Sequence, residues 1–169
     1  VLTRVRAYGP AATIVVLGHG AGPIEQALAW GDEIRVINHA PDLGLASSLQ
    51  VGINALRVLP DAFDGTFIVL GDQPWLRVEV LHALEAAATT ARPAARPVIV
   101  PRYETPGARN PALLLRPAWS WVDDLRGDRG LGPAIEAHPD QVLEVPVSGE
   151  MTDVDAPGDL PSNEKRARP

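Results

Sequence analysis

Two acidic segments of the chain carry side chains that could bind a divalent cation. Asp72 follows the apolar run 66–70 and a glycine, whereas Asp153 and Asp155 form an i, i+2 pair much later in the chain. In an extended segment, residues at i and i+2 point to the same side. Mg²⁺ suits these carboxylates, because proteins hold this hard cation through one or two carboxylates together with substrate phosphates. The sequence therefore predicts a magnesium site, provided that the fold brings the two segments together.

Both segments also have a purely structural interpretation. Asp72 could cap the helix expected to begin near Arg77, or it could close a turn. Asp155 could cap a helix that starts at Pro157. The residues alone support the structural and the functional interpretation about equally.

The composition argues against several other kinds of site and partner. The chain has no cysteine, and its four histidines lack the paired spacing of a zinc site. No Gly-x-Ser-x-Gly segment indicates an α/β-hydrolase. A net charge of −6 disfavours a broad surface for nucleic acid or anionic membrane, and no apolar stretch approaches the roughly 20 residues of a membrane span. Since cysteine-free chains are typical of reducing compartments, we expect a cytoplasmic protein.

The elements that would position the carboxylates alternate between strands and helices, which predicts an α/β sandwich. The run 66–70 has the pattern of a strand buried on both faces, as in a parallel sheet, and Asp72 would emerge at its carboxyl end. Ligands bind at this edge of open α/β sheets. Strands are predicted at 12–17, 33–38, 66–70, 98–100, 112–115 and 141–147, and helices at 2–8, 24–30, 47–58, 78–90, 119–125 and 132–137.

Two loops that follow predicted strands could contact a ligand. The glycine-rich turn 18–22 could cradle a phosphate, but its spacing is more typical of an ordinary strand-to-helix turn. Ser47 and Ser48 are suitable N-caps for the helix that is predicted after them. Their hydroxyls could instead meet the base or the ribose of a nucleotide.

Four segments, 44–52, 70–74, 127–130 and 153–160, stand in the order of one known family. Through them, residues 1–160 resemble the molybdenum cofactor cytidylyltransferase branch of the MobA-like NTP transferases, which leaves 161–169 as a flexible tail. The resemblance implies a Rossmann-like three-layer α/β/α sandwich with a mostly parallel sheet. It also implies Mg²⁺-dependent transfer of CMP from CTP to the phosphate of molybdopterin cofactor, with release of pyrophosphate.

The resemblance also assigns roles to individual residues. It makes Asp72 and Asp153 the catalytic metal ligands, with Asp155 as a further candidate ligand. The residues implied for nucleotide binding are Gly44, Ser47, Ser48 and Gly71. The residues implied on the acceptor side are Arg109, Asn110, Asp128 and Arg129, with Asn110 standing where the family usually has His.

The family pattern begins with a strand and a glycine-rich loop that wraps the triphosphate, and this sequence does not contain that segment. We therefore expect a sheet without its first strand. The exposed neighbouring strands would favour aggregation or pairing with another chain, such as a homo-oligomer. Two alternatives to cytidylyl transfer follow: a non-catalytic or truncated binding domain, and a guanylyl or sugar-phosphate nucleotidyltransferase.

Overall fold

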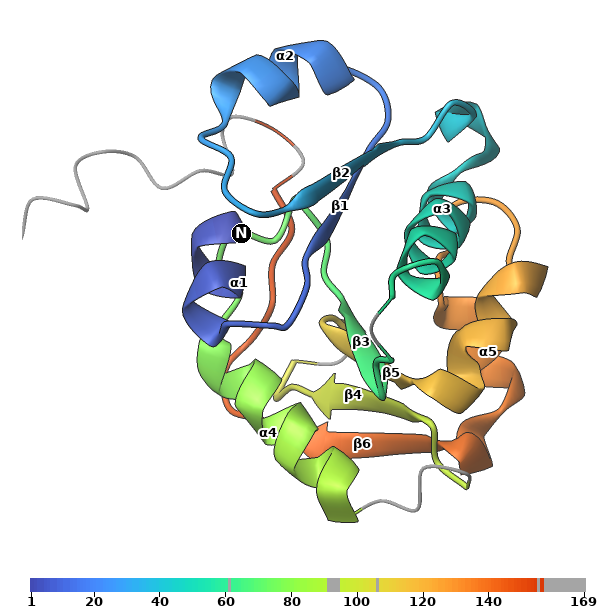
Figure 1. The fold of residues 1–169 in the computed structure, drawn as a ribbon. Helices are drawn as coiled ribbons and strands as arrows, with labels where there is room; N and C mark the ends of the chain where they lie inside the picture. The colour runs from blue at the N-terminus through green and yellow to red at the C-terminus, as the bar shows by residue number, and fades with distance from the viewer. Residues whose placement is uncertain (61, 91–94, 106, 155, 157–169) are drawn as a thin grey trace, which may run out of the picture.

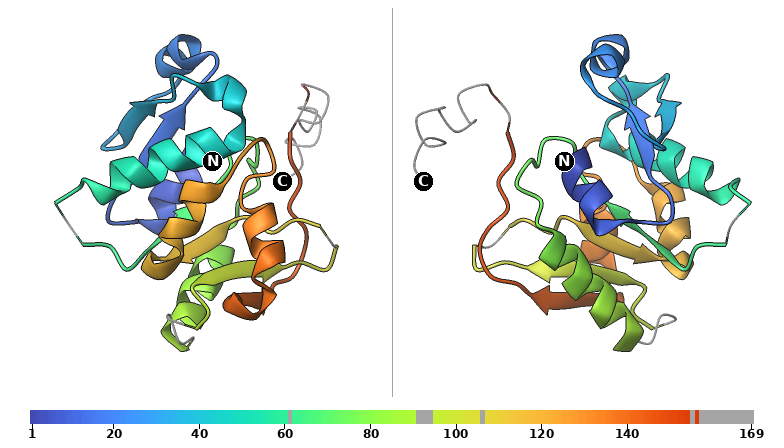
Figure 2. Two further views of the ribbon diagram at one scale, coloured as in Figure 1. Left: turned by 90° about the vertical axis from the view of Figure 1, so that its right-hand side faces the viewer. Right: turned by 60° about the vertical axis from the view of Figure 1, so that its left-hand side comes forward.

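The computed structural model describes residues 1–60, 62–90, 95–105, 107–154 and 156. It confirms the α/β class, since helices lie on both sides of the strands (Figures 1 and 2). Asp155 and the predicted tail 161–169 lie outside the described residues. The elements are α1 (Leu2–Tyr8), β1 (Ile14–Leu17), α2 (Ala21–Ala27), β2 (Ile34–Ile37), η1 (Pro41–Leu43), α3 (Leu45–Arg57), β3 (Gly65–Ile68), α4 (Val78–Thr90), β4 (Val98–Arg102), β5 (Ala112–Leu115), η2 (Arg116–Asp124), α5 (Gly132–Ala137), η3 (Pro139–Gln141) and β6 (Val142–Pro146).

The strands form two separate sheets rather than one mostly parallel sheet. β1 and β2 make a parallel pair, and the larger sheet has the order β3-β5-β4-β6. In that sheet β4 and β6 are parallel, but β5 runs antiparallel to both β3 and β4. The connection 103–111 explains the mixed sheet, because it is too short for the crossover of a dozen or more residues that parallel neighbours need.

Strand β3 differs most from its prediction. It ends at Ile68 rather than at residue 70, and all four of its residues are partly exposed instead of buried. Within the described chain β3 pairs with β5 alone, so its other edge has no partner strand. Asp72 therefore lies in the loop after β3, several residues beyond the end of the strand, and not directly at the strand's carboxyl end.

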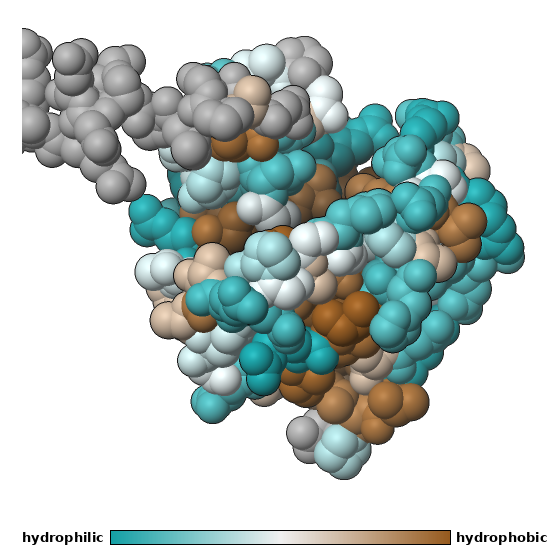
Figure 3. Space-filling model, turned by 90° about the horizontal axis from the view of Figure 1, so that it is seen from above, coloured by the Kyte–Doolittle hydropathy of each residue, from teal (hydrophilic) through white to brown (hydrophobic). Residues whose placement is uncertain are grey.

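The unpaired edges of β1 and β3 border a large hollow, which we call the β1–β3 cleft. It has a volume of about 1560 Å³ and is lined by residues of α1, β1, α3, β3 and α4. Above it, α2 buries none of its residues, and both Ile24 in the helix and Leu28 directly after it are exposed. The view from above shows hydrophobic surface set among hydrophilic surface on this side of the molecule (Figure 3).

The core divides between the two faces of the larger sheet, as alternation along its strands requires. Val98 and Val100 of β4 are completely buried on the face covered by α3, where they join Ala46 and Ile53 in one cluster. Ile99 lies between them in sequence and points to the other face, where α4 packs. Because its side chains alternate in this way, β4 packs against a helix on each face of the sheet.

Helix α1 packs on α4 and is also tied to the segment before β2. The Tyr8 ring meets the Phe67 ring edge-on with 5.4 Å between centroids. Arg6 Nε donates to Glu33 Oε1 at 2.6 Å, and Arg6 Nη2 donates to the carbonyl of Ala29 at 2.8 Å. Helix α1 therefore connects β3 and α4 to the segment that precedes β2.

No helix in the described part of the chain is long and apolar enough to cross a membrane.

The unpaired strand edges lead to a prediction about association. We expect the chain to form species larger than a monomer in a concentration-dependent way. In the described part of the chain β1 and β3 each have one edge without a partner strand, and its N–H and C=O groups can pair with another chain. Size-exclusion chromatography with light scattering over a hundredfold concentration range measures this. A single monomeric species over the whole range would contradict the prediction.

The Arg6–Glu33 ion pair predicts a pH dependence of stability. The Arg6 guanidinium lowers the pKa of Glu33 to about 2, so the carboxylate of the folded protein stays charged at a pH where the unfolded chain binds a proton. The pair's contribution is present in full above the ordinary glutamate pKa of about 4.3 and is lost as the pH falls through about 2. In urea unfolding between pH 7 and pH 2, Glu33→Gln should flatten this dependence, whereas Glu144→Gln, at an exposed position of β6, should not.

Candidate functional site

The loop between β3 and α4 presents Asp72 at the surface. Gly71 and Asp72 are exposed, whereas Gln73 is only 3% exposed. The loop folds into consecutive turns, since the N–H of Gln73 donates to the carbonyl of Leu70 at 3.4 Å and the N–H of Leu76 donates to that of Gln73 at 3.2 Å. Leu76 is 1% exposed and anchors the end of the loop in the core.

The fold brings the Asp72 loop against the second acidic segment. The backbone N–H of Val154 donates to the carbonyl oxygen of Asp72 at 2.8 Å. Beside this bond, Gln73 Nε2 donates to Asp153 Oδ1 at 2.7 Å. Two carboxylates that are far apart in the sequence therefore belong to neighbouring loops, as a shared cation site requires.

Of the three predicted metal ligands, Asp72 and Asp153 lie within the described residues. The described part of the chain contains no group of three or more His, Cys, Asp or Glu side chains that could hold a metal ion, and Asp155 lies outside it. A cation that keeps most of its shell as water and substrate oxygens fits two carboxylates, and Mg²⁺ binds in this way.

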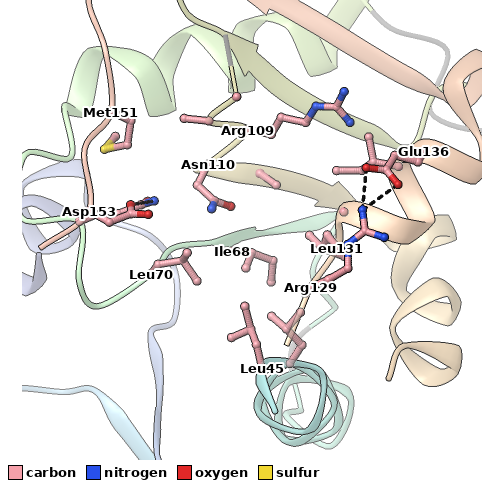
Figure 4. A pocket seen from close by; sticks show the side chains of 18 residues that line it. Leu45, Ile68, Leu70, Arg109, Asn110, Arg129, Leu131, Glu136, Met151 and Asp153 are labelled. Carbon is pink, nitrogen blue, oxygen red and sulfur yellow. Dashed lines mark hydrogen bonds and ion pairs between the residues drawn. The ribbon is translucent and has the colours of Figure 1, made fainter. Parts of the chain in front are cut away.

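A pocket of about 580 Å³ opens beside Asp153, and we call it the Asp153 pocket. Asp153 and Met151 lie at one end, and Arg129 and Glu136 lie at the other (Figure 4). Asn110 projects into the space between these ends. The pocket thus has a negative end that could hold a cation and a distant end that carries a guanidinium group.

Two arginines predicted on the acceptor side line the Asp153 pocket. Arg129 Nη2 lies 2.9 Å from both carboxylate oxygens of Glu136, and both side chains are exposed. Arg109 is exposed and precedes Asn110, whose carbonyl accepts a hydrogen bond of 2.9 Å from the Tyr103 hydroxyl. Burial raises the pKa of Tyr103.

Asp128, which is also predicted on the acceptor side, contacts α3 and is not among the residues that line the Asp153 pocket. Its Oδ1 accepts a hydrogen bond of 3.3 Å from the N–H of Leu45, and the Gly127 carbonyl accepts one of 3.0 Å from the N–H of Ala46. The loop 127–128 therefore caps the first turn of α3. Gly44 permits this close approach with a φ of 87°.

This cap corrects the predicted start of α3. The helix begins at Leu45 with Gly44 as its N-cap, so Ser47 and Ser48 lie inside the first turn. Asn38 Nδ2 donates to the hydroxyl oxygen of Ser47 at 2.8 Å and to that of Ser48 at 3.0 Å, and the Ser47 hydroxyl donates to the Gly44 carbonyl at 2.8 Å. Ser47 is buried and is therefore engaged by the protein itself.

Ser48 and Gly71 line the β1–β3 cleft, which adjoins the Asp153 pocket. Both hollows are lined by Leu45, Leu49, Ile68 and Leu70. In sequence, Asp72 lies between Gly71, which lines the cleft, and Gln73, which lines the Asp153 pocket. The acidic loops therefore stand next to the boundary between two spaces that could hold two ligands.

Two buried amides in this region were not identified from the sequence. Asn38 is 4% exposed and bonds both serines of α3, and Gln73 bonds Asp153. A signal for each was present, because Asn38 directly follows an apolar strand and Gln73 directly follows the proposed metal ligand. Once such an amide is buried, it is expected to be hydrogen-bonded.

Residues 1–142 match the family model of the MobA-like NTP transferase domain. Among solved structures, the fold resembles Rv0371c from Mycobacterium tuberculosis H37Rv with a TM-score of 0.75 and 28% identity, over 92% of this chain and 76% of that one. A complex of Rv0371c with manganese superposes with a TM-score of 0.74 and 25% identity, over 92% of this chain and 78% of that one.

Among curated proteins, the bifunctional protein GlmU of Paracidovorax citrulli is 37% identical over 91 residues. This similarity covers 52% of the present chain and 18% of GlmU. The chain thus spans about a fifth of the length of the curated relatives it matches.

The contact between Gly44 and the loop 127–128 leads to a prediction about stability. A Cβ atom at position 44 would lie 2.5 Å from Asp128 Oδ1 and 2.5 Å from the carbonyl carbon of Gly127. With the positive φ added, Gly44→Ala should destabilise the protein by about 1–3 kcal/mol in urea unfolding. Gly22→Ala is a matched control, since a Cβ there meets nothing within 4 Å, and an equal loss in both variants would contradict this account.

Proposed function

The chain belongs to the MobA-like NTP transferase family, and on that premise we propose that it transfers CMP from CTP to the phosphate of molybdopterin cofactor. The reaction would release pyrophosphate and depend on a divalent cation, for which Mg²⁺ is the expected ion. One observation carries the proposal: the loops of Asp72 and Asp153 are hydrogen-bonded to each other beside two adjoining hollows. The expected compartment is the cytoplasm.

Asp72 and Asp153 would hold the cation in this proposal. When bound, the ion would neutralise the charge of the phosphates during transfer. The acceptor phosphate oxygen would form a bond to the α-phosphorus while the bond from that phosphorus to pyrophosphate breaks. The protein's own contribution is then chiefly positioning, because this chemistry leaves little covalent work for side chains.

The two hollows support a division between the substrates. Ser48 and Gly71 line the β1–β3 cleft and represent the nucleotide side. Arg109, Asn110 and Arg129 line the Asp153 pocket and represent the acceptor side. Arginine suits this second role, since its planar guanidinium binds phosphate oxygens in pairs.

Three predicted residues enter the proposal with altered roles. The Asp128 carboxylate would act indirectly, because it caps α3 and thereby places Leu45, which lines both hollows. Ser47 and Gly44 would likewise support the first turn of α3 from within the protein. Ser48, at the cleft, remains the better candidate for contact with a nucleotide.

Calorimetric titration of CTP with Mg²⁺ tests the proposal. We expect micromolar binding to the chain and a loss of at least about tenfold in Asp72→Ala, because the phosphates lose the cation that links them to the protein. Asp140→Ala, at an exposed position of η3, is the matched control and should bind like the parent chain.

The same titration separates the alternatives. Tighter binding of GTP or UTP than of CTP would favour a guanylyl or sugar-phosphate transferase. Absence of binding for all three nucleotides would overturn the proposal and favour a non-catalytic member of the family.

A further inference from the structure

Gln73 forms a side-chain hydrogen bond between the two loops that carry the proposed metal ligands. Its Nε2 donates to Asp153 Oδ1 at 2.7 Å, which is at the short end of the range for N–H···O bonds. The residue is 3% exposed, so water competes little for this amide. Asp153 itself is exposed and lines the Asp153 pocket.

The two loops are held together without the Gln73 side chain. The Val154 N–H donates to the Asp72 carbonyl, and backbone turns and the buried Leu76 hold the loop 70–76. On the other side, Arg77 Nη2 donates to the carbonyl of Ser148 and ties the segment after β6 to the start of α4. What the Gln73 amide adds is therefore the direction of one carboxylate rather than the approach of the loops.

The chemical type of this donor suits a carboxylate that must hold a cation. A glutamine amide is neutral, so it fixes one oxygen of Asp153 without cancelling the negative charge that attracts the metal. A lysine or arginine at the same place would place a positive charge beside the cation site. The bond to Oδ1 also leaves Oδ2 of Asp153 for another ligand.

We propose that Gln73 is a positioning residue that orients the Asp153 carboxylate for a divalent cation. The inference rests on the proposed function, because it takes Asp153 as a metal ligand. It adds a residue outside the first coordination sphere, where hydrogen-bond partners of ligands typically contribute 10- to 100-fold to metal affinity.

Mn²⁺ binding tests the inference without any enzymatic assay. Binding is measured as the loss of the free-ion signal in electron paramagnetic resonance. Gln73→Met keeps the length and burial of the side chain but removes the amide. We expect it to bind Mn²⁺ about 10- to 100-fold more weakly than the parent chain.

Gln50→Met is the matched control for a general loss of structure. Gln50 Nε2 donates to the carbonyls of Val122, Asp123 and Leu125 at 3.1–3.2 Å, away from the acidic loops. This variant should lower the unfolding midpoint in urea and leave Mn²⁺ affinity unchanged. Equal losses of affinity in the Gln50 and Gln73 variants would overturn the positioning role.

A double-mutant cycle shows whether Gln73 acts through Asp153. In an Asp153→Ala background, Gln73→Met should cause no further loss of Mn²⁺ affinity. A further loss as large as that in the parent chain would overturn the inference. Undiminished affinity in the single Gln73→Met variant would overturn it and leave the proposed function standing, whereas absence of Mn²⁺ binding by the parent chain would overturn both.

Discussion

Strand β4 is the constraint on which the rest of the structure depends, because it must satisfy neighbours in four directions. Its edges pair with β5 and β6, and its side chains alternate between the α3 face and the α4 face with no exposure at positions 98–100. The loop that carries Arg109 and Asn110 precedes β5, and the segment that carries Asp153 follows β6. A register shift of one residue in β4 would move its buried side chains to the opposite faces of the sheet. It would also displace the elements that build the site relative to one another.

The sequence predicted the elements better than it predicted their pairing. Apolar runs located every strand, but β5 is antiparallel because a short connection precedes it, and β3 lies at a sheet edge although its residues suggest burial on both faces. The residues of an apolar run indicate that it forms a strand, but they do not indicate which strands will pair with it. For the same reason the start of α3 was misplaced: its cap comes from Asp128, which no local pattern around Ser47 could reveal.

The candidate site shows the same division between local and long-range information. The sequence predicts a shared cation site only on the condition that the fold brings the Asp72 and Asp153 segments together. The fold meets this condition through the hydrogen bond from the Val154 N–H to the Asp72 carbonyl. The buried amides of Asn38 and Gln73 depend on partners elsewhere in the chain, so residue type alone could not assign them. Family membership, in contrast, rests on the match of residues 1–142 to the MobA-like NTP transferase domain and does not require any of these contacts.

The cap on α3 has a consequence for the order in which the protein folds. Leu45 and Asp128 are 83 residues apart in sequence. Closing so long a loop costs conformational entropy before the contact between its ends can stabilise the chain. The backbone hydrogen bonds of the later turns of α3 are local to the helix, whereas the N–H groups of Leu45 and Ala46 in the first turn find acceptors in the loop 127–128. That turn should therefore be unformed in the folding transition state and close late, which makes the Leu45 corner of both hollows one of the last parts of the protein to assemble.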